Sequence, residues 1–179
     1  MKIKGFFFLL FIFSCSHVIA QRYITQAGTV SFFSAAPVEN IKAETADVTS
    51  IFISDDGTIA FSVPIKGFQF EKKLMQEHFN DKYMESDRYP RSTFSGVITG
   101  FNMNTTNLQS VRAKGKLTIH GITKPIDVPG TLEVKNGLVY MKSKFKVKTA
   151  DYGITIPTLL WKNISEEIEI TIDLTYKKQ

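Results

Sequence analysis

The chain has 179 residues, which is about the length of one domain. Its formal net charge of +5 is too mild to indicate a polyanionic partner, so we expect no nucleic-acid binding. The sequence contains one cysteine, which excludes a disulfide within the chain. The ten Phe and six Tyr residues that follow residue 20 are enough to build the core that must therefore stabilise the fold.

Residues 1–20 have the pattern of a secretory signal peptide. Lys2 and Lys4 form a basic start, an almost wholly apolar run follows, and small residues precede a cleavage point after Ala20. The apolar run is short for a membrane-spanning helix, so we expect no integral span. Cleavage after Ala20 predicts a periplasmic or secreted protein.

A lipid-anchored form is the alternative for this N-terminal segment. The residues up to Cys15 loosely resemble a bacterial lipoprotein box, although the bulky Phe13 departs from that pattern. We favour simple cleavage over anchoring. Residues 21–179 then form a single domain, since the sequence contains no internal repeat and no linker.

The first part of this domain predicts short strands. Residues 22–34 offer two short strand pieces, and residues 37–47 are polar and ambiguous. Strands rich in β-branched or alternating apolar residues are predicted at 48–54 and 58–65. The sequence Asp-Asp-Gly at 55–57 is a hairpin turn signal between them.

Residues 67–83 interrupt the strand pattern. Leu74, Met75, His78 and Phe79 recur at helical spacing, which predicts a helix of about two to three turns. A single helix in an otherwise all-β chain is expected to pack across an open end of the sheet. We expect Leu74, Met75 and Phe79 to face the interior.

The strands after residue 92 are longer and alternate more regularly. A strand at 92–101 precedes a long hairpin at 111–134, in which Gly121 supplies the backbone freedom for the turn. Pro125 and Pro129 each remove a donor from the strand ladder. We therefore expect both prolines at an edge or a bulge.

Two strands near the C-terminus carry complementary charges. The strand at 138–148 has lysines at 142, 144, 146 and 148 on one face, and the strand at 164–176 alternates isoleucines with acidic residues. We expect antiparallel neighbours, because opposite charges commonly pair across strands. A phosphate-binding lysine stripe is the alternative. In total, about nine short strands favour a sandwich or a barrel.

Motifs for catalysis and metal binding are absent from residues 21–179. These residues contain no H-E-x-x-H, G-x-S-x-G, glycine-rich phosphate loop or C-x-x-C. His78 and His120 are far apart and have no cysteine partner, which makes a poor metal site. We expect no enzyme, no cofactor and no metal; a hydrolase or isomerase that uses His78 or His120 is the alternative.

Two segments resemble the YceI-like family. Residues 79–94, FNDKYMESDRYPRSTF, resemble the stretch before a central strand in that family, and residues 114–126, KGKLTIHGITKPI, resemble its most recognisable segment. The resemblance implies an all-β fold, namely an extended antiparallel β-barrel, lipocalin-like in shape, with an apolar tunnel. It also implies secretion and the binding of long isoprenoid or other lipid chains.

Apolar residues around the helix and on inward strand positions are the candidate ligand contacts. They cluster where a barrel mouth would lie, and methionine suits a surface that adapts to a flexible apolar ligand. The predicted ligand-binding residues are Phe61, Phe68, Phe70, Leu74, Met75, Phe79, Phe94, Leu117, Ile119 and Phe145.

Whether the barrel interior is open or filled decides between two functions. The small inward residues Ala113, Gly115, Gly130 and Ser143 favour a cavity for a lipid. The alternative is a non-catalytic envelope module, structural or partner-binding, whose core is filled by its own side chains. We expect a void between Phe61, Phe94, Leu117 and Phe145 if the first interpretation holds. A dimer is compatible with either one.

Overall fold

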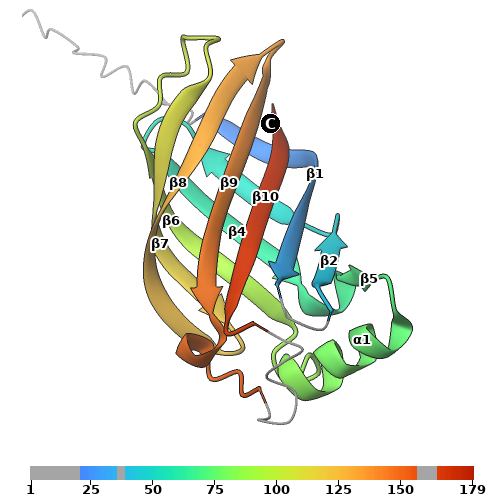
Figure 1. The fold of residues 1–179 in the computed structure, drawn as a ribbon. Coiled ribbons are helices and arrows are strands. Elements are labelled where there is room, and N and C mark those ends of the chain that lie inside the picture. The colour runs from blue at the N-terminus through green and yellow to red at the C-terminus, as the bar shows by residue number, and fades with distance from the viewer. Residues whose placement is uncertain (1–20, 36–38, 157–164) are drawn as a thin grey trace, which may run out of the picture.

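The computed structural model describes residues 21–35, 39–156 and 165–179. Ten strands form one antiparallel sheet in the order β10-β9-β8-β7-β6-β4-β3-β1-β2-β5, and β1 also pairs with β10 (Figure 1). That last pairing closes a barrel of eight strands, with β2 and β5 outside the ring. The expected antiparallel barrel is therefore confirmed, whereas the predicted signal peptide at 1–20 lies outside the described residues.

The strands follow the alternation of the sequence closely. They are β1 (Arg22–Ser34), β2 (Ile41–Thr45), β3 (Thr49–Ile53), β4 (Thr58–Pro64), β5 (Gln69–Phe70), β6 (Arg91–Thr99), β7 (Gln109–Ile119), β8 (Ile122–Lys135), β9 (Leu138–Lys148) and β10 (Glu167–Lys178). The helical segments are η1 (Ile65–Gly67), α1 (Lys73–His78), η2 (Phe79–Tyr83) and η3 (Thr149–Tyr152).

Strand β1 is one continuous strand of 13 residues and not two short pieces. One of its edges pairs with β10 along nearly its whole length, with a register shift between Thr25 and Ala27. The other edge pairs first with β3 and then with β2. Because the partner changes part-way, the apolar pattern of β1 is interrupted, and the sequence therefore suggested two strands.

Helix α1 crosses one end of the barrel beside β5, as expected (Figure 1). A π-helical turn, η2, continues it directly. Met75 and Phe79 are one turn apart and half-buried, whereas Leu74 is 61% exposed. The prediction that Leu74 faces inward is wrong, because neighbouring residues on a helix of 3.6 residues per turn point in different directions.

The β7–β8 hairpin turns at His120 and Gly121, both of which have positive φ angles, 49° and 74°. Pro125 and Pro129 pair with β7, but the pairing of β8 with β9 begins only at Gly130. Both prolines therefore lie on a part of β8 that has a free edge, which confirms the expectation for them.

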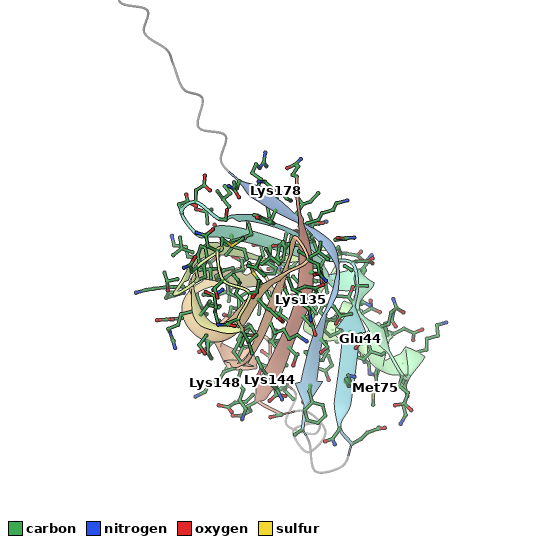
Figure 2. The ribbon with its side chains drawn as sticks, turned by 90° about the horizontal axis from the view of Figure 1, so that it is seen from above. Glu44, Met75, Lys135, Lys144, Lys148 and Lys178 are labelled. Carbon is green, nitrogen blue, oxygen red and sulfur yellow. The ribbon has the colours of Figure 1, made fainter. Side chains whose placement is uncertain are left out.

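The predicted pairing of β9 with β10 is also confirmed. Lys142 contacts Asp173 at 2.7 Å, and two further lysines of β9 contact acidic residues of β10 at 2.8 and 3.3 Å. Figure 2 shows Lys144 and Lys148 on the outside of the barrel. The lysine row is thus mainly a partner of an acidic row on the neighbouring strand.

A packed core fills the half of the barrel away from α1. Phe52, Ile59, Leu132, Val139 and Leu174 are fully buried there. This half contains the β8–β9 turn and the C-terminus, at the opposite end from α1 in Figure 1. This packed core therefore fills the half of the barrel that lies away from α1.

Candidate functional site

The half of the barrel next to α1 contains a cavity of about 400 Å³. Its floor consists of residues that also belong to the packed core, among them Ile59, Ile98 and Val111. Side chains of α1, η2 and η3 surround its outer end, including Met75 and Tyr152. The cavity therefore begins where the packed core ends and extends to the end of the barrel that α1 crosses.

Part of this wall was predicted from the sequence. The expected void between Phe61, Phe94, Leu117 and Phe145 is present, since all four side chains line the cavity. Of the predicted ligand-binding residues, all except Leu74 line it: Phe61, Phe68, Phe70, Met75, Phe79, Phe94, Leu117, Ile119 and Phe145. The exposed Leu74 is absent from the wall.

An aromatic cluster forms the wall beneath α1. Phe32 lies 5.3 Å from Phe79, 5.4 Å from Phe68 and 5.7 Å from Phe70, measured between ring centroids. Phe32 was not among the predicted contacts, although it lies in a clear apolar strand segment. Its position opposite the helix depends on the closure of β1 onto β10, which no local pattern indicates.

The inward faces of β8 and β10 supply further contacts that were not predicted. Ile126 and Val128 of β8 and alternate isoleucines of β10 line the cavity. The strict alternation in both strands already marked these residues as one face. An inward residue lines the cavity or joins the packed core according to its position along the barrel axis. Alternation does not indicate that position.

The small inward residues differ in what they do. Ala113, Gly130 and Ser143 line the cavity. Gly115 does not: a Cβ there would lie 2.3 Å from the Ser95 carbonyl oxygen and 2.9 Å from the Phe94 ring. The expectation that Gly115 leaves room for a ligand is therefore wrong, because β6 approaches it closely and the Phe94 ring covers it.

Few polar groups line the cavity, and several have partners within the protein. The Glu39 carboxylate pairs with Lys72, and the Ser34 hydroxyl oxygen accepts a hydrogen bond from the Ser165 amide at 2.8 Å. Burial raises the pKa of Tyr83 and, with a smaller contribution from nearby Asp151, that of Tyr152. The mostly apolar wall therefore suits an uncharged apolar chain.

His120 contacts residues of two other segments and so links three segments of the chain. Its Nε2 lies 2.8 Å from Glu85 Oε2, its Nδ1 lies 3.2 Å from the Tyr152 carbonyl oxygen, and its ring packs on Tyr89 at 4.5 Å. These contacts join the β7–β8 turn to the loop after η2 and to η3. Within the part of the chain that the structure describes, no group of three or more His, Cys, Asp or Glu residues is arranged to hold a metal.

The sequence matches the profile of the YceI-like domain over residues 12–176. The chain belongs to the YceI-like family. The match covers nearly the whole sequence, in agreement with the resemblance carried by residues 79–94 and 114–126. No curated protein matches the sequence. Among the described residues of this YceI-like chain, no helix has the length and apolar character needed to cross a membrane.

Solved structures share the YceI-like barrel at low sequence identity. A polyisoprenoid-binding domain from Saccharophagus degradans has a TM-score of 0.75 at 14% identity, covering 88% of this chain and 98% of that one. BcnA from Burkholderia cenocepacia has a TM-score of 0.71 at 16% identity, with 83% and 95% covered. The YCEI protein of Campylobacter jejuni has a TM-score of 0.63 at 17% identity, with 79% and 86% covered. At these identities the likeness establishes the fold.

Proposed function

We propose that this protein is a secreted or periplasmic carrier that holds one long isoprenoid or other lipid chain in the barrel cavity. The observation that carries the proposal is the apolar wall of a cavity of about 400 Å³ that is continuous with the packed core. Burial of apolar surface contributes about 25 cal/mol per Å², so an extended hydrocarbon chain gains affinity along its whole length. A structural neighbour described as polyisoprenoid-binding supports the same class of ligand.

The proposed ligand contacts are the predicted residues that line the cavity, from Phe61 to Phe145, with Leu74 left out. The tail of the chain lies against the floor near Ile98 and Val111. Its polar end lies at the mouth, where His78 and Lys148 lie on the lining. The mouth is the natural place for a headgroup, because the interior offers few polar partners.

Binding without catalysis suits this site better than a reaction does. His120 has both ring nitrogens engaged by Glu85 and the Tyr152 carbonyl group. His78 lies at the cavity mouth on α1. A general base needs a substrate proton within reach, and the Glu39 carboxylate on the lining is already paired with Lys72, within a wall that is mostly aromatic and aliphatic. The signal-like residues 1–20 support export.

A titration with isoprenoid alcohols of increasing length tests the proposal. Geraniol, farnesol and geranylgeraniol share one headgroup, so a cavity for the chain predicts tighter binding with each added unit until the cavity is full. Ala113→Phe, which projects into the cavity, should abolish this binding. Lys114→Phe, the next residue on the outer face, should leave it unchanged. Affinity that is independent of chain length, or equal in both variants, would contradict the proposal.

A further inference from the structure

Strands β8 and β9 separate part-way along the barrel wall. They pair only where residues 130–135 face residues 138–143. Beyond that point β8 remains paired with β7 down to Ile122, and β9 remains paired with β10 down to Lys148. Residues 122–129 and 144–148 therefore face each other without a shared ladder, and Figure 1 shows the two strands diverging toward the α1 end.

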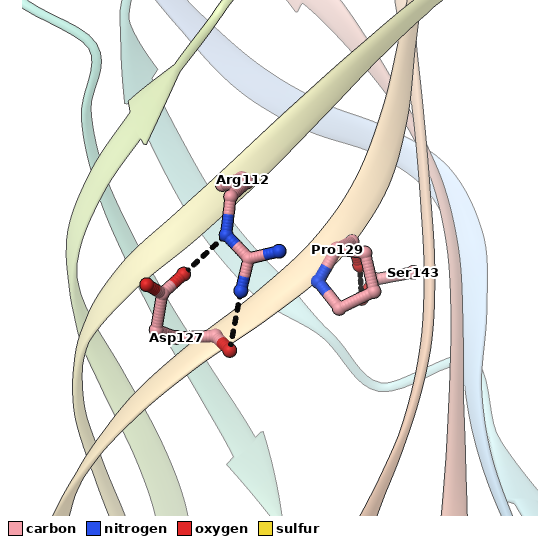
Figure 3. A network of polar contacts seen from close by, with 4 residues as sticks. All are labelled: Arg112, Asp127, Pro129 and Ser143. Carbon is pink, nitrogen blue, oxygen red and sulfur yellow. Dashed lines mark hydrogen bonds and ion pairs between the residues drawn. The ribbon is translucent and has the colours of Figure 1, made fainter.

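Backbone groups on the unpaired edge of β8 are either missing or already hydrogen-bonded, so this edge is a poor template for another strand. Pro125 and Pro129 have no N–H to donate. The Asp127 carbonyl oxygen accepts a hydrogen bond from Arg112 Nη2 at 3.0 Å, and the Pro129 carbonyl oxygen accepts one from Ser143 Oγ at 2.7 Å (Figure 3). Arg112 Nε also donates to the Asp127 carboxylate at 2.7 Å. These contacts keep the edge stable without a neighbouring strand.

The opening between the two strands is closed at its wide end by η3. The Tyr152 carbonyl oxygen contacts His120 Nδ1, and Gly153 lies against the side chain of Ile122. We call the opening bounded by residues 122–129, residues 144–148 and η3 the β8–β9 window. It has an apex at Gly130 and Ser143, two strand edges and a helical base.

The cavity reaches this window. Its lining includes inward residues on both edges, Val128 of β8 and Val147 of β9. It also includes Thr131 and Lys142, which face each other in the register beside the apex and alternate with the inward residues. Lys142 is exposed and pairs with Asp173 on the outer face. The lining of the cavity therefore includes residues from both faces of the wall next to the apex of the window.

We propose that the β8–β9 window is a lateral portal through which the apolar chain enters and leaves the barrel. The portal rests on the proposed carrier function and adds the route by which the ligand moves. Its inner rim is apolar, with Ile126, Val128 and Val147, which suits the passage of an apolar chain. The window provides a way in that does not require α1 to move.

Stopped-flow fluorescence with all-trans-retinol, a fluorescent isoprenoid alcohol, tests the portal on the full chain. Val128→Trp places an indole on the window rim and should slow both association and release by about ten-fold. Lys114→Trp, on the outer face of β7, should keep both wild-type rate constants. A substitution that only fills the cavity has the opposite effect on release, because lost affinity appears mainly as faster dissociation.

The outcomes separate the portal from the carrier function. Unchanged association with faster release in Val128→Trp overturns the portal and leaves the carrier function standing. No saturable retinol binding by the wild-type protein overturns both. If Val128→Trp does not fold, Val147→Trp on the opposite edge of the window replaces it. Slower association and slower release of retinol in this variant support the portal, whereas unchanged association rejects it.

Discussion

The Tyr176 hydroxyl oxygen lies 2.9 Å from Ser50 Oγ, and both side chains are buried in the packed half of the barrel. Ser50 Oγ also donates to the Ala60 carbonyl oxygen at 2.8 Å. With its proton committed there, Ser50 accepts from Tyr176. This pair joins β10 to β3 across the barrel interior.

Ser50→Ala should destabilise the protein more than Tyr176→Phe does. Ser50→Ala leaves a buried phenol without an acceptor, which costs about 1–3 kcal/mol of unfolding free energy, whereas Tyr176→Phe removes a donor and costs about 1 kcal/mol. Urea denaturation of both variants measures the difference. The double variant should be no less stable than Ser50→Ala alone, and a strictly additive double variant would argue against this hydrogen bond.

Stability should fall at alkaline pH because of Tyr176. Burial raises the pKa of Tyr176 above its ordinary value, with the Ser50 hydrogen bond acting weakly in the other direction. The folded protein therefore keeps this proton while the unfolded chain loses it above a pH of about 10. The stabilisation is complete below that pH and decreases as the pH rises further, by about 1.4 kcal/mol per unit.

Denaturation curves between pH 8 and pH 11, compared for wild type and Tyr176→Phe, measure this contribution. The variant should show the shallower loss of stability above a pH of about 10. Burial raises the pKa of Tyr83 and Tyr152 in the same direction, so part of the slope should remain in the variant. Parallel curves for the two proteins would contradict the assignment.

Gly115→Ala and Ala113→Phe should separate folding from cavity volume. A Cβ at Gly115 would lie 2.3 Å from the Ser95 carbonyl oxygen, so Gly115→Ala should cost about 1–3 kcal/mol or more. Ala113→Phe projects into open space and should change unfolding free energy by about 1 kcal/mol or less while removing farnesol binding. Thermal melts with and without farnesol report both quantities, and a stable Gly115→Ala protein would refute the close approach.

Phe79→Ala should cost about 2 kcal/mol, below the 3–5 kcal/mol typical of a fully buried phenylalanine. Phe79 is half-buried, with ring centroids 5.0 Å from Phe70 and 5.7 Å from Phe68. Leu74→Ala on α1 is the matched control and should change stability by about 0.5 kcal/mol or less, because Leu74 is exposed. Equal losses from both substitutions, measured by urea denaturation, would show that the helix packs differently.

Side-chain alternation and charge were sufficient to predict much of the barrel wall. The pairing of β9 with β10 follows from two rows of opposite charge, and it is found with Lys142 opposite Asp173. The prolines at 125 and 129 correctly marked a free edge. These features are local in sequence, because each depends on the residue type and on a period of two along a strand.

Features set by distant contacts were not predictable in the same way. Alternation is the same on both sides of Gly130, so it does not mark where β9 leaves β8. The small size of Gly115 predicts open space in the barrel interior, yet strand β6 and the Phe94 ring occupy that space. The short strands β2 and β5 were also not predicted, because an ambiguous polar stretch and a two-residue bridge have no period to detect.

Native mass spectrometry of the protein purified from its own source tests the central claim most directly. We expect a population heavier than the polypeptide by one lipid, released as an apolar compound on extraction with organic solvent. Ala113→Phe purified in the same way should lose that population while remaining folded, and Lys114→Phe should keep it. A wild-type protein with the mass of the polypeptide alone, and no lipid in the extract, would contradict the carrier function.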